Sequence, residues 1–225
     1  MASSPGDTLL SALPSASAAD LFRQGRAVVL EPNQVLFLAG DPGDGCYRVE
    51  EGLLKVSVIG PSGAERILAI LGPGALLGEL SMIDGHPRSA SATAIRGAKL
   101  TFVSRASFDA FTRQNPEVYR HITAVLAQRL RAIDESLAAA SFLPLKGRVA
   151  RALLSLADAF GKDVGSGRIL VHQKVSQSDL AAMAGIAREN VSRILQEWTR
   201  TALISRLSGY YCLEDRAALK REATV

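Results

Sequence analysis

The chain has 225 residues, enough for one large domain or two ordinary ones, and it is 48% hydrophobic and 21% charged with a net charge of +4. This composition supports a packed core and excludes a largely disordered chain. No apolar run approaches the roughly 20 residues that span a membrane, and the first residues lack the basic and apolar regions of a signal peptide, so we expect a cytoplasmic protein without a membrane partner.

Residue types that bind metals are sparse and scattered. The two cysteines, Cys46 and Cys212, lie far apart, and the three histidines occur singly. A structural zinc or iron–sulfur site needs several such ligands at close spacing. One histidine could bind haem, but a lone histidine is more often a surface residue. Because there is also no nucleophile–base pair and no phosphate-binding loop of an NTPase, we expect no metal site, no catalytic residue and no enzyme.

Residues 21–113 have the pattern of β structure. Short runs of β-forming residues alternate with turns rich in glycine and proline, such as 39–45, 60–63 and 71–74. The predicted strands are 27–30, 35–38, 46–49, 53–59, 66–71, 90–95 and 99–103. Many short strands of this kind predict an antiparallel sandwich or jelly roll, which we assign to a first domain at residues 1–114.

A long helix that ends at about Phe142 is predicted next, and residues 115–143 are assigned to this dimerisation helix and a hinge. Asn115 can cap it, Pro116 suits its first position, and no glycine or proline interrupts it before Phe142. After the first step, apolar residues recur on one face at alternating spacings of four and three: Tyr119, Leu126, Leu130, Ile133, Leu137 and Ala140. This coiled-coil pattern predicts a dimerisation helix, although the same face could instead pack on the β domain.

Leu143 and Pro144 end that helix and begin a second domain at residues 144–225. Its predicted elements are a helix at 145–161, a strand pair around 168–171, helices at 177–184 and 187–201, and a hairpin that pairs 204–207 with 210–213. The domain has 13 Lys and Arg against 8 Asp and Glu, whereas the preceding 143 residues have 13 against 14. This excess of positive charge favours a polyanionic partner.

A helix-turn-helix is predicted within residues 175–204. Ser176 can cap the first helix in a capping box with Asp179, and Gly185 suits the turn that ends this helix. Ala181 is small where the two helices would cross. Two short helices joined by a glycine-containing turn are typical of this DNA-binding motif.

The second of these helices exposes polar side chains near its N-terminal end, the part that enters the major groove. Arginine can donate two hydrogen bonds to guanine, and glutamate can accept one from cytosine. Glu189 and Arg193 could alternatively form a surface ion pair of little consequence. The candidate DNA-binding residues are Ser176, Gln177, Arg188, Glu189, Asn190, Ser192 and Arg193.

A second motif covers residues 78–90. Glu79 offers a carboxylate that can accept a hydrogen bond from a ribose hydroxyl, and Arg88 offers a charged, forked donor for a phosphate. Ser89 and Ala90 add a hydroxyl and accessible backbone N–H groups. An isolated Gly-Glu or Pro-Arg pair would carry no such meaning, and Arg88 could equally be a surface residue.

With these motifs, the sequence resembles the cyclic-AMP receptor protein / fumarate–nitrate regulator (CRP/FNR) family of bacterial transcription factors over about residues 21–219. The resemblance implies an α+β fold: an N-terminal antiparallel β jelly roll that binds a cyclic nucleotide, a long dimerisation helix, and a C-terminal winged helix-turn-helix. It implies a homodimer that binds double-stranded DNA, with RNA polymerase as a further expected partner.

The segment 185–195 is similar to the recognition helix of that family. Arg188, Glu189 and Arg193 match the base-reading positions of the cyclic-AMP receptor branch, which implies a TGTGA-like inverted repeat. Ser192 is instead typical of the oxygen-sensing branch, whose half-site starts differently. The presence of Arg188 favours the half-site that contains guanine.

Residues 78–90 resemble the phosphate-binding cassette of cyclic-nucleotide-binding domains. The implied contacts to phosphate and ribose come from Gly78, Glu79, Leu80, Arg88, Ser89 and Ala90. On the purine side, the Thr-Ser pair of the family is replaced by Ile133, which cannot hydrogen-bond a base, and Asp134, which can accept from an amine of adenine or guanine. We therefore expect cAMP first and cGMP second, with a cyclic dinucleotide or a vestigial, effector-independent pocket as the alternative.

Overall fold

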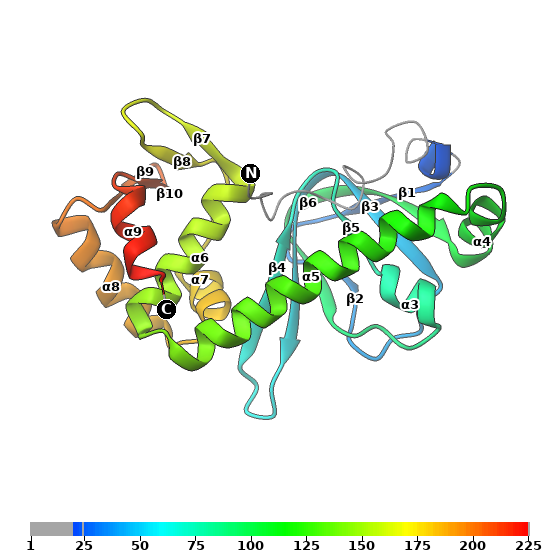
Figure 1. Ribbon diagram of the computed structural model, residues 1–225, viewed down its shortest axis with the longest axis horizontal. Coiled ribbons are helices and arrows are strands. Elements are labelled where there is room, and N and C mark those ends of the chain that lie inside the picture. The colour runs from blue at the N-terminus through cyan, green and yellow to red at the C-terminus, as the bar shows by residue number, and fades with distance from the viewer. Residues whose placement is uncertain (1–19, 24, 225) are drawn as a thin grey trace. The chain divides into compact units, whose positions relative to one another are not determined.

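The computed structural model describes residues 20–23 and 25–224, apart from the side chains at 121, 125, 128, 129 and 132. The described residues form two compact units that divide between Leu130 and Arg131, inside one long helix. Figure 1 shows the elements of both units. The predicted boundaries at 114 and 143 lie on either side of this helix.

The N-terminal unit is built on a six-stranded antiparallel sheet. Its strands are β1 (Arg26–Leu30), β2 (Val35–Phe37), β3 (Gly45–Ile59), β4 (Glu65–Leu71), β5 (Leu76–Leu77) and β6 (Ser91–Ser104). The main order is β1-β6-β3-β4, with β2 paired to β6 and β5 paired to β3. The predicted fold class, an antiparallel β domain followed by helices and a helix-turn-helix, is confirmed.

Strands β3 and β6 are each continuous where the sequence predicted two strands. The register between them shifts three times between Val49 and Leu54, so the ladder bulges there without ending. Gly52 has a φ of +93°, and a side chain at this position would clash with the backbone of Gly97 on β6. The two glycines therefore mark facing bulges in the gaps between the predicted strands.

Two helices interrupt the region that was predicted to be entirely β structure. Helix α3 (Glu79–Asp84) lies between two left-handed glycines, and α4 (Arg105–Gln114) begins at Ser104, whose hydroxyl accepts from the Ser107 N–H at 3.2 Å. The prediction was wrong here because helices of six and ten residues are too short to show a clear helical periodicity in the sequence. The capping serine before α4 was the available signal.

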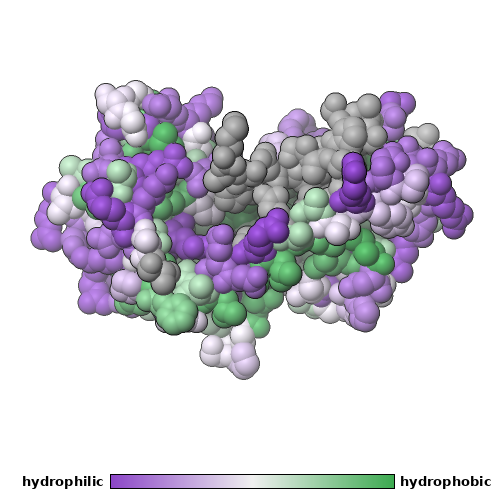
Figure 2. Space-filling view, viewed as in Figure 1, coloured by the Kyte–Doolittle hydropathy of each residue, from purple (hydrophilic) through white to green (hydrophobic). Residues whose placement is uncertain are grey.

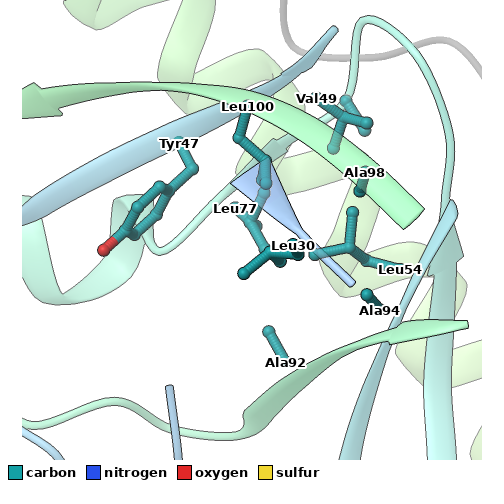
Figure 3. Close-up of a cluster of buried hydrophobic side chains, with 10 residues drawn as sticks. Leu30, Tyr47, Val49, Leu54, Leu77, Ala92, Ala94, Ala98 and Leu100 are labelled. Atoms are coloured by element: carbon teal, nitrogen blue, oxygen red, sulfur yellow. The ribbon is translucent and has the colours of Figure 1, made fainter. Parts of the chain in front are cut away.

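Two hydrophobic clusters fill the N-terminal unit. Figure 3 shows the first, in which residues such as Val49, Leu54 and Leu100 point together between strands. The second cluster joins the sheet to the helices through Met82 of α3, Phe108 of α4, and Val118 and Ile122 of the next helix. The first two turns of that helix are therefore held in the core.

Helix α5 (Glu117–Phe142) has the predicted extent. The side-chain amide of Asn115 donates to the Phe111 carbonyl at 3.0 Å, so this residue closes α4, and its own carbonyl accepts from the Val118 N–H at 3.1 Å at the start of α5. Its side chain as the cap of α5 stays a prediction. Leu130, Ile133 and Leu137 are 59%, 62% and 67% exposed. Figure 2 shows hydrophobic atoms gathered along one side of this part of α5. The chain itself thus leaves much of the predicted seam uncovered.

The C-terminal unit contains the predicted helices and hairpin, with small differences. Its elements after α5 are α6 (Leu145–Phe160), β7 (Gly161–Asp163), β8 (Ile169–Val171), α7 (Gln177–Ala184), α8 (Arg188–Arg200), β9 (Ile204–Leu207), β10 (Tyr210–Leu213) and α9 (Arg216–Glu222). The four strands form an antiparallel sheet in the order β7-β8-β10-β9. Trp198, Leu180 and Leu213 lie in its core. Helix α9, capped by Asp215, was not predicted.

None of the helices in the described part of the chain is long and apolar enough to cross a membrane.

Candidate effector pocket and DNA interface

Gly78 shapes the first candidate site. It precedes α3 with a φ of +80°, a conformation that residues with a side chain rarely adopt. A Cβ atom at this position would collide with the Arg88 guanidinium. The glycine therefore has two functions: it turns the chain into α3, and it lets Arg88 pass against the backbone.

Arg88 is buried, with a side-chain exposure of 2%. Its Nη1 donates to the carbonyls of Gly45 and Gly78 at 2.9 and 2.7 Å. Its guanidinium carbon lies 4.5 Å from the centre of the Phe37 ring and 5.9 Å from that of Tyr47. The alternative that Arg88 is a surface residue is therefore wrong.

Arg88 is a buried cation beside an exposed carboxylate. An oxygen of the Asp44 carboxylate lies 3.3 Å from Nη2, and this side chain is 71% exposed. Its Nε is buried and has no hydrogen-bond partner among the described residues. Burial of a cation costs several kcal/mol unless an anion and further hydrogen bonds offset it. The donor geometry and the charge here both fit a small anion such as a phosphodiester.

Glu79 lies in the same buried region and is 1% exposed. Burial, followed by the charge of Glu79, raises the pKa of the Cys46 thiol to about 12, and the opposing effect of Arg88 is smaller. These influences place Cys46 close to both charged groups. The carboxylate and guanidinium that the motif predicted as ribose and phosphate ligands are thus brought into one region of the fold.

The remaining predicted ligands differ in their positions. Leu80 and Ser89 are exposed beside the buried pair, and Ala90 is buried immediately before β6. Ile133 and Asp134 are exposed on α5, within the other compact unit. Their assignment to the purine base stays a prediction.

The turn at 39–45 supplies site residues that the sequence analysis treated only as a turn. The Gly40 N–H donates to the Arg88 carbonyl, and the Arg88 backbone N–H donates to the backbone carbonyl of Asp41, both at 2.8 Å. These two bonds hold Arg88 against the turn that also carries Asp44 and Gly45. No local pattern predicts this, because the two segments are more than 40 residues apart in the chain.

Arg105 fixes the position of α3. Its side chain donates to the Ser81 carbonyl and, at 3.4 Å, to the Gly43 carbonyl. Its backbone N–H donates to the backbone carbonyl of Asp44 at 2.9 Å. One residue of α4 thus ties together the helix that begins at Glu79 and the turn that carries Asp44.

The helix-turn-helix is formed as predicted. The Ser176 hydroxyl accepts from the Asp179 N–H at 3.0 Å, and the Asp179 carboxylate accepts from the Ser176 N–H at 3.3 Å, which completes the capping box. Gly185 has a φ of +65° and ends α7. Ala181 is buried where α7 and α8 meet, so the small residue serves their close packing.

Helix α8 has a sharp division between its two faces. It buries Val191, Ile194, Leu195 and Trp198. Arg188, Glu189 and Arg193 are exposed, whereas Asn190, Ser192 and, on α7, Gln177 are half-buried. Arg193 donates to the side-chain oxygen of Asn190, so in the described structure it is not paired with Glu189. Both charged groups remain accessible to a partner on the open face of α8.

Two family models match the chain, one on each unit. The cyclic nucleotide-binding domain matches residues 27–115, and the Crp-like helix-turn-helix domain matches residues 147–222. Together they span most of the described chain and include both candidate sites.

The chain is also similar to characterised proteins along most of its length. It is 36% identical over 211 residues to the CRP-like cAMP-activated global transcriptional regulator of Mycobacterium tuberculosis, a match that covers 93% of each chain. A CRP-family transcriptional regulator from Thermus thermophilus has 29% identity and a TM-score of 0.72, covering 87% of this chain and 96% of that one. FixK2 from Bradyrhizobium japonicum has a TM-score of 0.80 at 20% identity, covering 89% and 98%, and this match shows the fold alone.

Proposed function

This chain belongs to the CRP/FNR family of DNA-binding transcription regulators, and from that premise we propose that it is a homodimer whose DNA binding is switched by cAMP. It is a regulator and not an enzyme, as are the relatives it matches. The proposal concerns the effector, the oligomeric state and the DNA sequence that it reads.

Buried Arg88 is the observation that carries the effector proposal. A cyclic nucleotide has one negative charge on a phosphodiester, which suits a buried guanidinium whose Nε has no hydrogen-bond partner among the described residues. Glu79 would accept from the ribose hydroxyl, and the exposed residues Leu80 and Ser89 would border the ligand. The relative from Mycobacterium tuberculosis is named as cAMP-activated, which supports cAMP as the first choice over cGMP.

Helix α5 supports the homodimer. Leu130, Ile133 and Leu137 are spaced three and four residues apart and are more than half exposed. An apolar stripe with this spacing buries itself efficiently against a second copy of the same helix. We propose that two chains pair along it.

The open face of α8 supports a TGTGA-like inverted repeat. Arg188 and Arg193 would donate to guanine, and Glu189 would accept from cytosine or orient an arginine. Ser176 and Gln177, at the start of α7, would contact the DNA backbone at the positive end of that helix. RNA polymerase is proposed as the partner through which the bound dimer acts.

The test combines calorimetry with a DNA-binding assay on the full chain. We expect cAMP to bind more tightly than cGMP or cyclic di-GMP, and to raise the affinity for a TGTGA inverted-repeat duplex relative to a scrambled duplex. Arg88→Leu should abolish nucleotide binding, whereas Arg113→Leu, a change at an exposed arginine of α4, should leave the affinity unchanged.

Two outcomes would favour the alternatives. The alternatives are an effector other than cAMP and DNA binding without an effector. They arise because Ile133 and Asp134 replace side chains that contact the purine in the cyclic-AMP receptor branch. DNA binding that is indifferent to all three nucleotides would indicate an effector-independent regulator with a vestigial pocket. DNA binding that responds to the cyclic dinucleotide alone would show that this ligand, and not cAMP, is the effector.

A further inference from the structure

Two aromatic rings lie beside the Arg88 guanidinium. Its central carbon is 4.5 Å from the centre of the Phe37 ring and 5.9 Å from that of Tyr47, and the two ring centres are 6.0 Å apart. Figure 3 shows Tyr47 at the edge of the hydrophobic cluster of this unit, and Phe37 packs against the same cluster. A cation within about 6 Å of a ring centre is attracted to the ring face. Phe37 is the nearer ring and therefore the stronger partner.

The sheet fixes the place of Phe37. Strand β2 pairs with β6 in a register that sets Phe37 opposite Ala92. A few residues further along, the Gly40 N–H donates to the Arg88 carbonyl at 2.8 Å. The chain on either side of the ring is thus bonded to the segment that carries Arg88. Because these bonds are made by the backbone, the fold itself holds the ring beside the guanidinium.

The edge of Arg88 that is left for a ligand follows from the donors that the protein already uses. Nη1 donates to the carbonyls of Gly45 and Gly78, which takes both of its hydrogens. The other edge of the planar group is formed by Nε and Nη2. Nε has no hydrogen-bond partner among the described residues, and Nη2 lies 3.3 Å from an oxygen of the exposed Asp44 carboxylate. The Nε–Nη2 edge therefore suits two parallel bonds to a phosphate.

The Phe37 ring restrains what the two carbonyls leave free. The bonds from Nη1 hold one end of the guanidinium, whereas contact with the ring restrains its centre and hence the direction of the other edge. The Arg88 side chain is 2% exposed, so water does not weaken this attraction, which is strongest for desolvated pairs. Without the ring, the free edge would have to be ordered when the phosphate binds, and ordering of a side chain lowers affinity.

We propose that Phe37 is a positioning residue for the effector: its ring holds the Arg88 guanidinium so that the Nε–Nη2 edge is ready for the cyclic phosphate. This role rests on the proposed cAMP site and adds to it a residue that acts through Arg88. The phosphate half of the pocket is then preformed, because the arginine is ordered when the chain folds and not when the ligand binds.

The experiment is calorimetry of the full chain with cAMP, applied to the wild type and three variants. Phe37→Leu keeps an apolar side chain but removes the ring face, whereas Phe37→Tyr keeps the ring. Phe22→Leu is the matched control. The centre of the Phe22 ring lies 4.8 Å from the guanidinium carbon of Arg48, so this variant loses the same type of contact at an arginine that is not proposed to bind the effector.

Phe37→Leu should weaken the Kd for cAMP by about 5- to 30-fold, which corresponds to the loss of one buried cation–π contact. Phe37→Tyr and Phe22→Leu should stay within about 2-fold of the wild type, because the ring beside Arg88 is kept in both. Wild-type affinity in Phe37→Leu would overturn the proposal, and so would a loss in Phe37→Tyr as large as in Phe37→Leu. Phe37→Met, which also lacks a ring, replaces the leucine variant if that variant does not fold.

A double-mutant cycle separates the positioning of Arg88 from general support of the pocket. Lysine has no planar fork for the ring to orient. In the Arg88→Lys background, Phe37→Leu should therefore change the Kd for cAMP by less than about 2-fold. A loss of equal size in both backgrounds would show that the ring supports the pocket as a whole, and this would overturn the proposal.

Failure of the proposed effector is distinguishable from failure of this role. If the wild type does not bind cAMP, the same variants are compared with cGMP and cyclic di-GMP, which carry the same phosphodiester. The NMR signal of the Arg88 Nε–H, identified by its absence in Arg88→Lys, needs no ligand at all. The ring should shift this signal upfield in the wild type and in Phe37→Tyr relative to Phe37→Leu. An equal position in all three proteins would overturn the proposal.

Discussion

Replacement of Arg88 by leucine should separate effector binding from folding. The substitution removes two hydrogen bonds to the carbonyls of Gly45 and Gly78, and each charge-assisted bond of this kind contributes about 1.5–3 kcal/mol. It also removes a buried cation whose Nε has no hydrogen-bond partner among the described residues, and burial of such a cation costs several kcal/mol. Because these effects oppose each other, we expect the free energy of unfolding to change by no more than about 2 kcal/mol.

The effect on the effector should be much larger. Removal of one partner of a buried charged pair costs about 2–5 kcal/mol of binding, which corresponds to a Kd for cAMP that is weaker by about 30-fold to several thousand-fold. Arg88→Lys keeps the charge but loses the fork, so its affinity should fall between those of the wild type and Arg88→Leu.

The assay is calorimetry with cAMP, paired with thermal unfolding with and without the nucleotide. At a cAMP concentration of 100 times the wild-type Kd, the wild type should gain about 2.7 kcal/mol of stability, and Arg88→Leu should gain less than about 1 kcal/mol. Wild-type affinity in the leucine variant would refute a role for Arg88 in the site. Loss of the folded state in that variant would instead show that Arg88 is mainly structural.

Four further results are expected. Gly78→Ala should lower stability by about 1–2 kcal/mol in denaturant unfolding, because its φ of +80° disfavours a side chain, and should weaken cAMP binding by displacing Arg88; a neutral effect on both would contradict the geometry. Arg188→Ala should cost about 1–3 kcal/mol on the TGTGA repeat and little on scrambled DNA, and equal losses in anisotropy would argue against base reading. Tyr211→Phe should leave stability unchanged or raise it by up to about 1 kcal/mol, since it removes a buried hydroxyl without a partner; a clear loss in thermal unfolding would reveal a missed hydrogen bond. Because its pKa is raised to about 12, the Cys46 thiol stays protonated at pH 8, so iodoacetamide should label it only after unfolding, and rapid labelling of the folded chain would count against its burial.

The sequence predicted the C-terminal unit most accurately, because its signals are local. The capping box at Ser176, the left-handed Gly185 and the Ser208-Gly209 turn each depend on neighbouring residues, and the hairpin strands have the predicted bounds. In the N-terminal unit, glycine at position 52 fits a turn or a bulge equally well. The choice depends on the facing Gly97, which is remote in sequence.

The candidate pocket was predicted in part for the same reason. Gly78, Glu79 and Arg88 lie within one short segment, so their pattern is visible in the sequence. The aromatic rings that stack on Arg88 and the carbonyl of Gly45 come from a different part of the chain. These contacts become visible only in the folded structure, where the segment that carries them lies against Arg88.

The β9–β10 hairpin is the edge of a larger sheet, because β10 also pairs with β8 through Cys212 and Leu170. A hairpin anchored in this way has little freedom to bend relative to α8, which packs against the same core through Trp198. The distance between Arg193 on the helix and Arg206 on the hairpin is therefore set by the fold of the domain. A signal that reorients this domain moves both groups as one body. In the proposed homodimer, such a signal would change whether the two domains fit a pair of half-sites, but not the spacing within a half-site.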